Sequence, residues 1–188
     1  MSMRFLRTLQ ALCAAVALAA MAASGSPAET AELSEKSVLV LLDYAWAVLP
    51  DKFTTPAGKV IAVDKKNRDS VKIPIEVARE VITVARLSAH AQICKLADAQ
   101  IANYRTMMKV EEARKTWSDQ QLLYISQLHL FTVMWLTGNV KIEEKDGENV
   151  VVVDEAGGDQ KEQTCTDEQK KKVEEQIVAY FKAHEKTN

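Results

Sequence analysis

The spacing of apolar residues predicts a chain of helices, of which residues 75–115 form the longest uninterrupted stretch. These 41 residues contain neither Pro nor Gly, and apolar side chains recur every three or four positions. Seven positions form the expected buried face of the first half: Val77, Ala78, Val81, Ile82, Val84, Ala85 and Ala89. In the second half the apolar positions are Ile93, Leu96, Ala97, Ile101, Tyr104, Met107 and Met108.

The apolar face of this stretch turns by about a quarter of a turn near residues 90–93, on a helix with 3.6 residues per turn. A straight helix of this length would span about 60 Å, whereas a compact domain of 160 residues has a radius of gyration of about 15 Å. We therefore expect one of two arrangements. Either the helix bends or breaks, with residues 106–115 as the expected place, or its halves pack against different partners.

A first helix is predicted over residues 29–49, before Pro50, because Pro disfavours helical geometry in the residue before it. It has two apolar faces, which predicts burial on both sides. One face holds Leu33, Ser37, Val40, Tyr44 and Val48, and the other holds Leu39, Leu42, Trp46 and Leu49. Asp43 is the one charge in this apolar run. An edge carboxylate, or one paired with a basic residue of the long helix, is favoured over a buried acid with a raised pKa.

Two further helices carry capping signals at their starts. Ser118 with Gln121, and Thr166 with Gln169, match the capping box, in which the first residue and the residue three positions later satisfy each other's backbone. The first signal begins a nearly all-apolar helix over residues 119–137 that ends before Gly138, so we expect it in the core. The second begins a helix to about His184, with a docking face of Ile177, Tyr180 and Phe181.

Two β-hairpins are predicted. Residues 59–63 are rich in β-branched side chains and residues 70–73 alternate apolar with polar, with a polar turn over residues 64–69. Residues 140–144 and 149–153 flank an Asp-Gly turn, which is the clearest hairpin signal in the chain. The two hairpins are expected to pair into one small antiparallel sheet. The predicted fold class is therefore α+β and predominantly helical, with four or five helices, one or two short hairpins and one disulfide.

The N-terminal 28 residues have the order of a secretory signal peptide. Arg4 and Arg7 precede an Ala- and Leu-rich apolar run over residues 9–23, and small residues follow up to Ala28. This order predicts removal before residue 29, with cuts after Ala23 or Ser24 as alternatives. The run is short for a membrane span, so no stable insertion is expected after cleavage. Residues 29–188 are predicted to form a single domain.

Composition and charge narrow the partner classes. Without the two leader arginines the chain carries 22 basic and 26 acidic residues, which is not the basic footprint expected for nucleic-acid binding. The Ala-rich leader is typical of bacteria and predicts a periplasmic, or secreted, protein.

Cys94 and Cys165 are the two cysteines left after cleavage, and an even pair in an oxidising compartment predicts a disulfide. A less favoured alternative is a zinc site. His90 lies four residues before Cys94, and His129 would complete a set of two histidines and two cysteines. The disulfide is preferred because its compartment favours oxidation, so no metal or other cofactor is predicted.

One helical face offers candidate binding residues. Arg79, Arg86 and His90 lie within about 40° of each other on a helix wheel, so this face could bind an anion or a partner's carboxylate. The alternative is a solvated face of mixed charge, because Glu76, Glu80 and Thr83 share it.

No catalytic residues are predicted. The sequence lacks a GxSxG nucleophile elbow, a CxxC redox pair and a Gly-rich phosphate loop. The expected function is therefore a non-catalytic periplasmic interaction or structural protein. The alternative is a periplasmic small-ligand-binding protein for an apolar compound or an anion, and an enzyme comes third.

Overall fold

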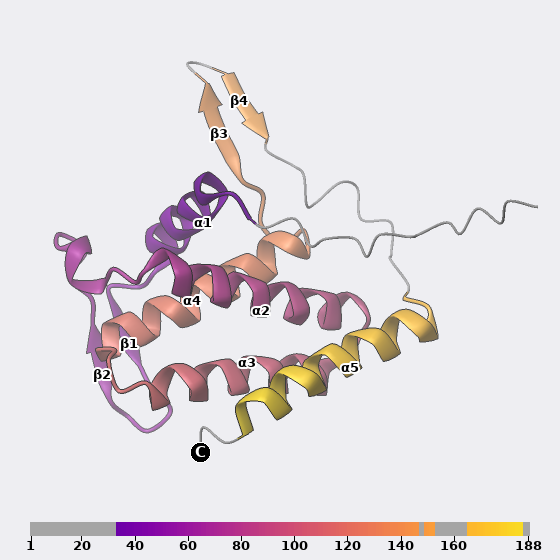
Figure 1. Ribbon diagram of the computed structural model, residues 1–188. Coiled ribbons are helices and arrows are strands. Elements are labelled where there is room, and N and C mark those ends of the chain that lie inside the picture. The colour runs from indigo at the N-terminus through magenta and orange to yellow at the C-terminus, as the bar shows by residue number, and fades with distance from the viewer. Residues whose placement is uncertain (1–32, 147–148, 153–164, 186–188) are drawn as a thin grey trace, which may run out of the picture. The chain divides into compact units, whose positions relative to one another are not determined.

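A computed structural model describes residues 33–146, 149–152 and 165–185, which all belong to the unit that begins at Leu33. These residues form five α-helices, one 3-10 helix and two hairpins (Figure 1), so the predicted helix-dominated α+β class is confirmed. The elements are α1 (Glu35–Val48), β1 (Lys52–Thr54), β2 (Val60–Ala62), η1 (Arg68–Val71), α2 (Ile75–Ile93), α3 (Ala97–Ala113), α4 (Asp119–Leu136), β3 (Glu143–Asp146), β4 (Asn149–Val152) and α5 (Asp167–His184).

Helix α2 is the central element, because it packs against each of the other four α-helices. All seven positions predicted for its buried face are buried. They divide between two clusters: most join residues of α1 and α4 in the main core, while Ala85 and Ala89 pack against Val133 of α4. Small side chains at these two positions allow α4 to approach α2 closely.

The long predicted helix breaks after Cys94, and this corrects the expected position at residues 106–115. The Lys95 N–H donates to the Gln92 carbonyl (3.0 Å), and the Leu96 N–H donates to the Ala91 carbonyl (2.8 Å). Lys95 adopts a left-handed φ of 61°. These features define a Schellman motif, which ends a helix at a residue in the left-handed region. The chain then starts α3 at Ala97, and Ile101, predicted to be buried, is 47% exposed.

The two capping boxes are confirmed. Ser118 and Gln121 cap α4, and Thr166 and Gln169 cap α5, each with reciprocal hydrogen bonds. Four large residues of α4 are fully or almost fully buried, which agrees with its predicted place in the core: Tyr124, Ile125, Leu128 and Phe131. The docking face of α5 differs from the prediction, since Val173 and Ile177 are buried whereas Phe181 is 46% exposed.

Helix α1 buries one face rather than two. Val38, Leu41, Leu42 and Ala45 are buried, while Leu39 and Val48 are 47% and 48% exposed. The prediction of burial on both sides is therefore wrong for α1. Its buried face meets α2 and α4, but in the described part of the chain no element covers the opposite face.

The first hairpin has one strand where it was predicted, because β2 lies within residues 59–63, but its partner strand is β1 rather than residues 70–73. Strand β1 pairs antiparallel with β2, with Phe53 opposite Ile61, while residues 68–71 form η1. The second hairpin is confirmed, with Asp146 opposite Asn149. The hairpins form two separate two-stranded sheets, so the single joint sheet was a wrong prediction. Residues 155–164, for which Gly157 and Gly158 predict a loop, lie outside the described residues.

Candidate functional site

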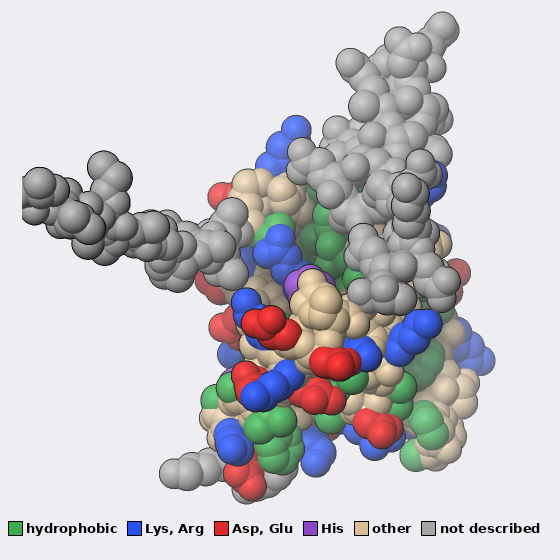
Figure 2. All heavy atoms as spheres, turned by 90° about the vertical axis from the view of Figure 1, so that its right-hand side faces the viewer, with side chains coloured by type: hydrophobic (Ala, Val, Ile, Leu, Met, Phe, Trp, Pro, Cys, Tyr) green, Lys and Arg blue, Asp and Glu red, His purple; other side chains and the backbone are tan. Residues whose placement is uncertain are grey.

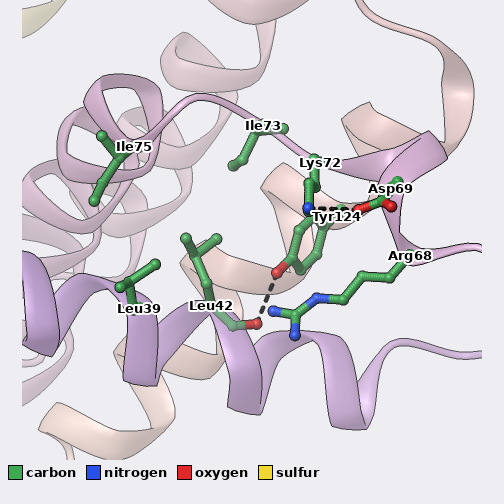
Figure 3. A pocket seen from close by; sticks show the side chains of 8 residues that line it. All are labelled: Leu39, Leu42, Arg68, Asp69, Lys72, Ile73, Ile75 and Tyr124. Carbon is green, nitrogen blue, oxygen red and sulfur yellow. Dashed lines mark hydrogen bonds and ion pairs between the residues drawn. The ribbon is translucent and has the colours of Figure 1, made fainter.

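A half-open apolar cleft of about 290 Å³ lies where α1, η1 and the start of α2 meet above α4 (Figure 3). Apolar side chains line most of it: Leu39 and Leu42 of α1, Ile73, and Ile75 of α2. Tyr124 of α4 also lines it, and three charged residues, Arg68, Asp69 and Lys72, complete the lining. The cleft therefore combines an apolar interior with a charged margin.

Local sequence explains how η1 and its flank line the cleft. Val71 and Ile73 are buried while Lys72 between them is exposed, so this segment alternates as an extended chain does. Pro74 is the N-cap of α2, where its missing N–H costs no helical hydrogen bond. The chain therefore turns directly from the cleft wall into α2.

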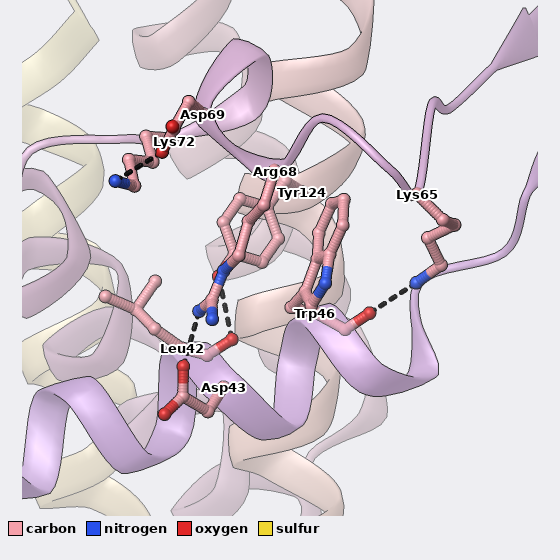
Figure 4. A network of polar contacts seen from close by, with 8 residues as sticks. All are labelled: Leu42, Asp43, Trp46, Lys65, Arg68, Asp69, Lys72 and Tyr124. Carbon is pink, nitrogen blue, oxygen red and sulfur yellow. Dashed lines mark hydrogen bonds and ion pairs between the residues drawn. The ribbon is translucent and has the colours of Figure 1, made fainter.

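A network of polar contacts fastens η1 to the end of α1 (Figure 4). Arg68 Nη2 lies 2.5 Å from Asp43 Oδ1, and the Arg68 guanidinium lies 5.9 Å from the centre of the Trp46 ring. Lys65 Nζ lies 4.4 Å from the same ring centre and donates to the Trp46 carbonyl at 2.5 Å. Cation–π contacts of this kind contribute about 0.5–1 kcal/mol at exposed sites. Asp43 is therefore paired with a basic residue, which the sequence favoured over a buried acid. Its partner is Arg68 of η1 rather than a residue of the predicted long helix.

Tyr124 closes the bottom of the cleft. Its hydroxyl donates to the Leu42 carbonyl at 2.7 Å, and its ring meets Trp46 edge-on, with 6.0 Å between ring centres. Burial raises the pKa of the Tyr124 hydroxyl, and nearby Arg68 partly offsets this effect. Tyr124 is therefore a neutral, structural donor at neutral pH.

The charged margin of the cleft belongs to a basic segment of the chain. Residues 51–72 carry six lysines and arginines against three aspartates, although the whole chain has a net charge of −2. Lys72 pairs with Asp69 at 2.5 Å and lowers the pKa of that carboxyl. Both groups are exposed, so this pair is weak and each partner can exchange it for another charge.

The three residues of the predicted binding face on α2 do not form one continuous row of cations. Arg79 is half-buried and donates from Nη1 to the Leu33 carbonyl at the start of α1. Arg86 and His90 are exposed one turn apart. Partial burial of the His90 ring, followed by the charge of Arg86, lowers the pKa of His90. Binding of an anion at this face stays a prediction.

The predicted cysteine pair is joined. Cys94, the C-cap of α2, forms a disulfide with Cys165, which precedes the cap of α5, and their Cα atoms are 5.1 Å apart. Both cysteines pack with Ala91, Val173 and Ile177 in a small apolar cluster. His129, the fourth member of the alternative zinc set, instead contacts Ser88. In the described ranges, no group of three or more His, Cys, Asp or Glu residues is placed to hold a metal ion.

One polar cluster was missed by the sequence analysis. Asn103 of α3 donates from Nδ2 to the Val84 carbonyl and to Ser88 Oγ, both at 2.9 Å. Ser88 Oγ in turn lies 3.0 Å from His129 Nε2. A serine beside a histidine base is the beginning of a nucleophilic site, but Ser88 and Asn103 are fully buried and His129 is 4% exposed. These residues join three helices and do not line the cleft.

Comparison with protein-family models, curated proteins and solved structures gave no match. Within the described ranges no helix has the length and apolar character needed to cross a membrane.

Proposed function

We propose that this chain is an exported, non-catalytic interaction protein that binds a partner protein in the cleft between α1, η1 and α2. The expected partner segment inserts one or two apolar side chains beside Leu39 and Ile73. Carboxylates flanking those side chains meet Lys72 and the basic segment 51–72. The signal-peptide pattern and the disulfide support export to the periplasm or beyond.

The exposure of Leu39 is the observation that carries this proposal. Its side chain is 47% exposed at the edge of an apolar cleft, whereas the core beneath is closed by Leu42, Ile73 and Tyr124. An apolar surface with a polar margin is typical of protein interaction sites. The excess of lysine and arginine in residues 51–72 favours an acidic partner.

The shape of the cleft favours a partner protein over a small ligand. Small-molecule sites commonly enclose about 300–1,000 Å³ and bury most of the ligand surface. This cleft has about 290 Å³ and is open along one side. An apolar compound bound there would remain largely in water, while a side chain presented by a larger partner would be covered by the rest of that partner.

Site-specific photocrosslinking in the producing cells tests the proposal. A benzophenone amino acid at Leu39 is expected to give a covalent adduct with a partner protein, identified by mass spectrometry. Val48 lies on the same helix with 48% exposure but does not line the cleft, so it is the matched control and is expected to give no such adduct.

A binding measurement with the identified partner segment completes the test. Leu39→Asp is expected to weaken its binding at least tenfold, and Lys72→Glu several-fold, whereas Val48→Asp leaves it unchanged. Equal adducts at residues 39 and 48 would overturn the proposal. An adduct with a small molecule instead of a protein would support the ligand-binding alternative.

A further inference from the structure

Helix α5 carries a second, outward face that is centred on Val178. On a helix wheel, seven exposed residues lie within about 60° of Val178 or at it: Lys171, Glu174, Glu175, Val178, Phe181, Lys182 and Glu185. We call this set the α5 outer face. Its two apolar members, Val178 and Phe181, are 47% and 46% exposed. A shallow groove of about 420 Å³ runs along it.

Two pairs of charged residues on the α5 outer face have opposite signs at similar distances before and after Val178. A basic residue, Lys171, lies seven positions before Val178, and an acidic residue, Glu185, lies seven positions after it. Glu175 and Lys182 flank Val178 at three and four positions. Two such helices placed antiparallel, with Val178 beside Val178, therefore bring Lys182 against Glu175 and Lys171 against Glu185.

We propose that the α5 outer face binds the same face of a second copy of this chain, in an antiparallel and two-fold symmetric dimer. In such an isologous contact each pair occurs twice, which gives four ion pairs around a centre of two valines and two phenylalanines. A parallel arrangement is disfavoured, because it would place Lys171 against Lys171 and Glu175 against Glu175.

The environment of α5 agrees with this contact. Figure 2 shows acidic and basic side chains interspersed with apolar ones on the side of the molecule where α5 begins. The ion pair described on the α5 outer face joins Lys171 to Glu175 at 3.8 Å, with both side chains mostly exposed. Such a pair is easily rearranged, so Glu175 is able to accept Lys182 of a second copy. An interface of one 18-residue helix per copy is small, so the dimer is expected to be weak and reversible.

Sedimentation equilibrium of the exported protein with its disulfide intact tests the dimer over a range of concentrations. The wild-type mass is expected to rise from that of a monomer toward that of a dimer, and to fall again with added salt. Val178→Asp is expected to remain monomeric. Leu130→Asp is the matched control, since Leu130 is 49% exposed on α4, and it is expected to associate as the wild type does.

A charge exchange separates a specific contact from a general loss of folding. Glu175→Lys alone and Lys182→Glu alone each place like charges opposite one another, so each variant is expected to be monomeric. An equal mixture of the two is expected to dimerise, because every pair across the contact is then attractive. Circular dichroism checks that each variant is folded. A monomeric wild type at all concentrations, a dimeric Val178→Asp, or a mixture that stays monomeric would overturn the proposal.

Discussion

Ser88 and His129 meet in the buried interior, where Ser88 Oγ on α2 lies 3.0 Å from His129 Nε2 on α4. Asn103 donates to one lone pair of Ser88 Oγ, and the serine hydroxyl proton is available for donation to Nε2. This arrangement requires a neutral imidazole with its proton on Nδ1. Burial lowers the pKa of His129 to about 4, which agrees with a neutral ring at neutral pH.

The stability of the protein should therefore depend on the protonation of His129. Its pKa in the folded state, about 4, lies below the ordinary histidine value of 6.5, so the unfolded chain binds a proton that the folded chain excludes. The free energy of unfolding is expected to be highest above pH 6.5 and to fall progressively toward pH 4, by up to about 3 kcal/mol. Urea denaturation at pH 7, 5.5 and 4.5 measures this slope.

Two variants test whether His129 causes this pH dependence of stability. His129→Gln keeps an acceptor near Ser88 but cannot be protonated, so its stability should change much less than that of the wild type between pH 7 and 4.5. His90→Gln should retain most of the slope, because His90 is exposed and its pKa is lowered less than that of His129. A full slope in His129→Gln would show that other groups cause the acid sensitivity.

Removing the serine hydroxyl should also destabilise the core. Ser88→Ala leaves both His129 Nε2 and one N–H of Asn103 without their present partner, and each buried unsatisfied group costs about 1–3 kcal/mol. We expect a total loss of about 2–4 kcal/mol in the free energy of unfolding. Ser126→Ala on α4 is the control, because Ser126 bonds Tyr104 in a half-buried position, and it should cost less than half as much.

The disulfide is expected to hold α5 onto the ends of α2 and α3. Cys94 and Cys165 are separated by 71 positions, and a cross-link closing such a loop contributes about 4 kcal/mol in the chain-entropy model. The double variant Cys94→Ala/Cys165→Ala should therefore unfold at lower denaturant concentration. Hydrogen exchange should accelerate first in α5, which buries only Val173 and Ile177, and later in α4. Equal acceleration in both helices would contradict a local role.

Periodicity and capping signals were sufficient to predict the central helices. The buried face of α2, the two capping boxes and the cysteine pair each depend on residues close in sequence or on simple counting. The cleft depends instead on which residues of α1 remain uncovered, and the predicted faces give no basis for that choice, because Leu39 and Leu42 were assigned to the same face. Leu39 and Leu42 appear alike in the sequence, yet Leu42 is 7% exposed and Leu39 is 47% exposed.

The polar interior and one strand of the first hairpin were missed for related reasons. Ser88, Asn103 and His129 come from three helices, and nothing in their local spacing indicates that they meet. Strand β1 has only three residues, all exposed, so it lacks the alternation that identifies a half-buried strand. The alternating residues 70–73 were assigned to the hairpin instead, but tertiary packing buries Val71 at the end of η1 and places Ile73 in the wall of the cleft.

The end of α2 was missed because its left-handed residue is a lysine. Helix α4 ends in the same way, with Gly138 at φ 72° and the Asn139 N–H bonded to the Met134 carbonyl at 2.8 Å. Gly138 marks this end in the sequence, since glycine adopts positive φ without a steric penalty. Lys95, at φ 61°, occupies the equivalent position after α2 with a Cβ atom that disfavours it.

Exchanging these residues should therefore change stability in opposite directions. Gly138→Ala is expected to lower the free energy of unfolding by about 1 kcal/mol, because alanine must adopt a left-handed conformation there. Lys95→Gly is expected to raise it by up to about 1 kcal/mol, reduced by the greater freedom of glycine in the unfolded chain. Lys95→Val should instead destabilise, because a β-branched residue is poorly tolerated at positive φ. Thermal and urea denaturation of the three variants measure these differences. A destabilised Lys95→Gly would mean that the contacts of the lysine side chain stabilise the protein by more than its left-handed backbone conformation costs.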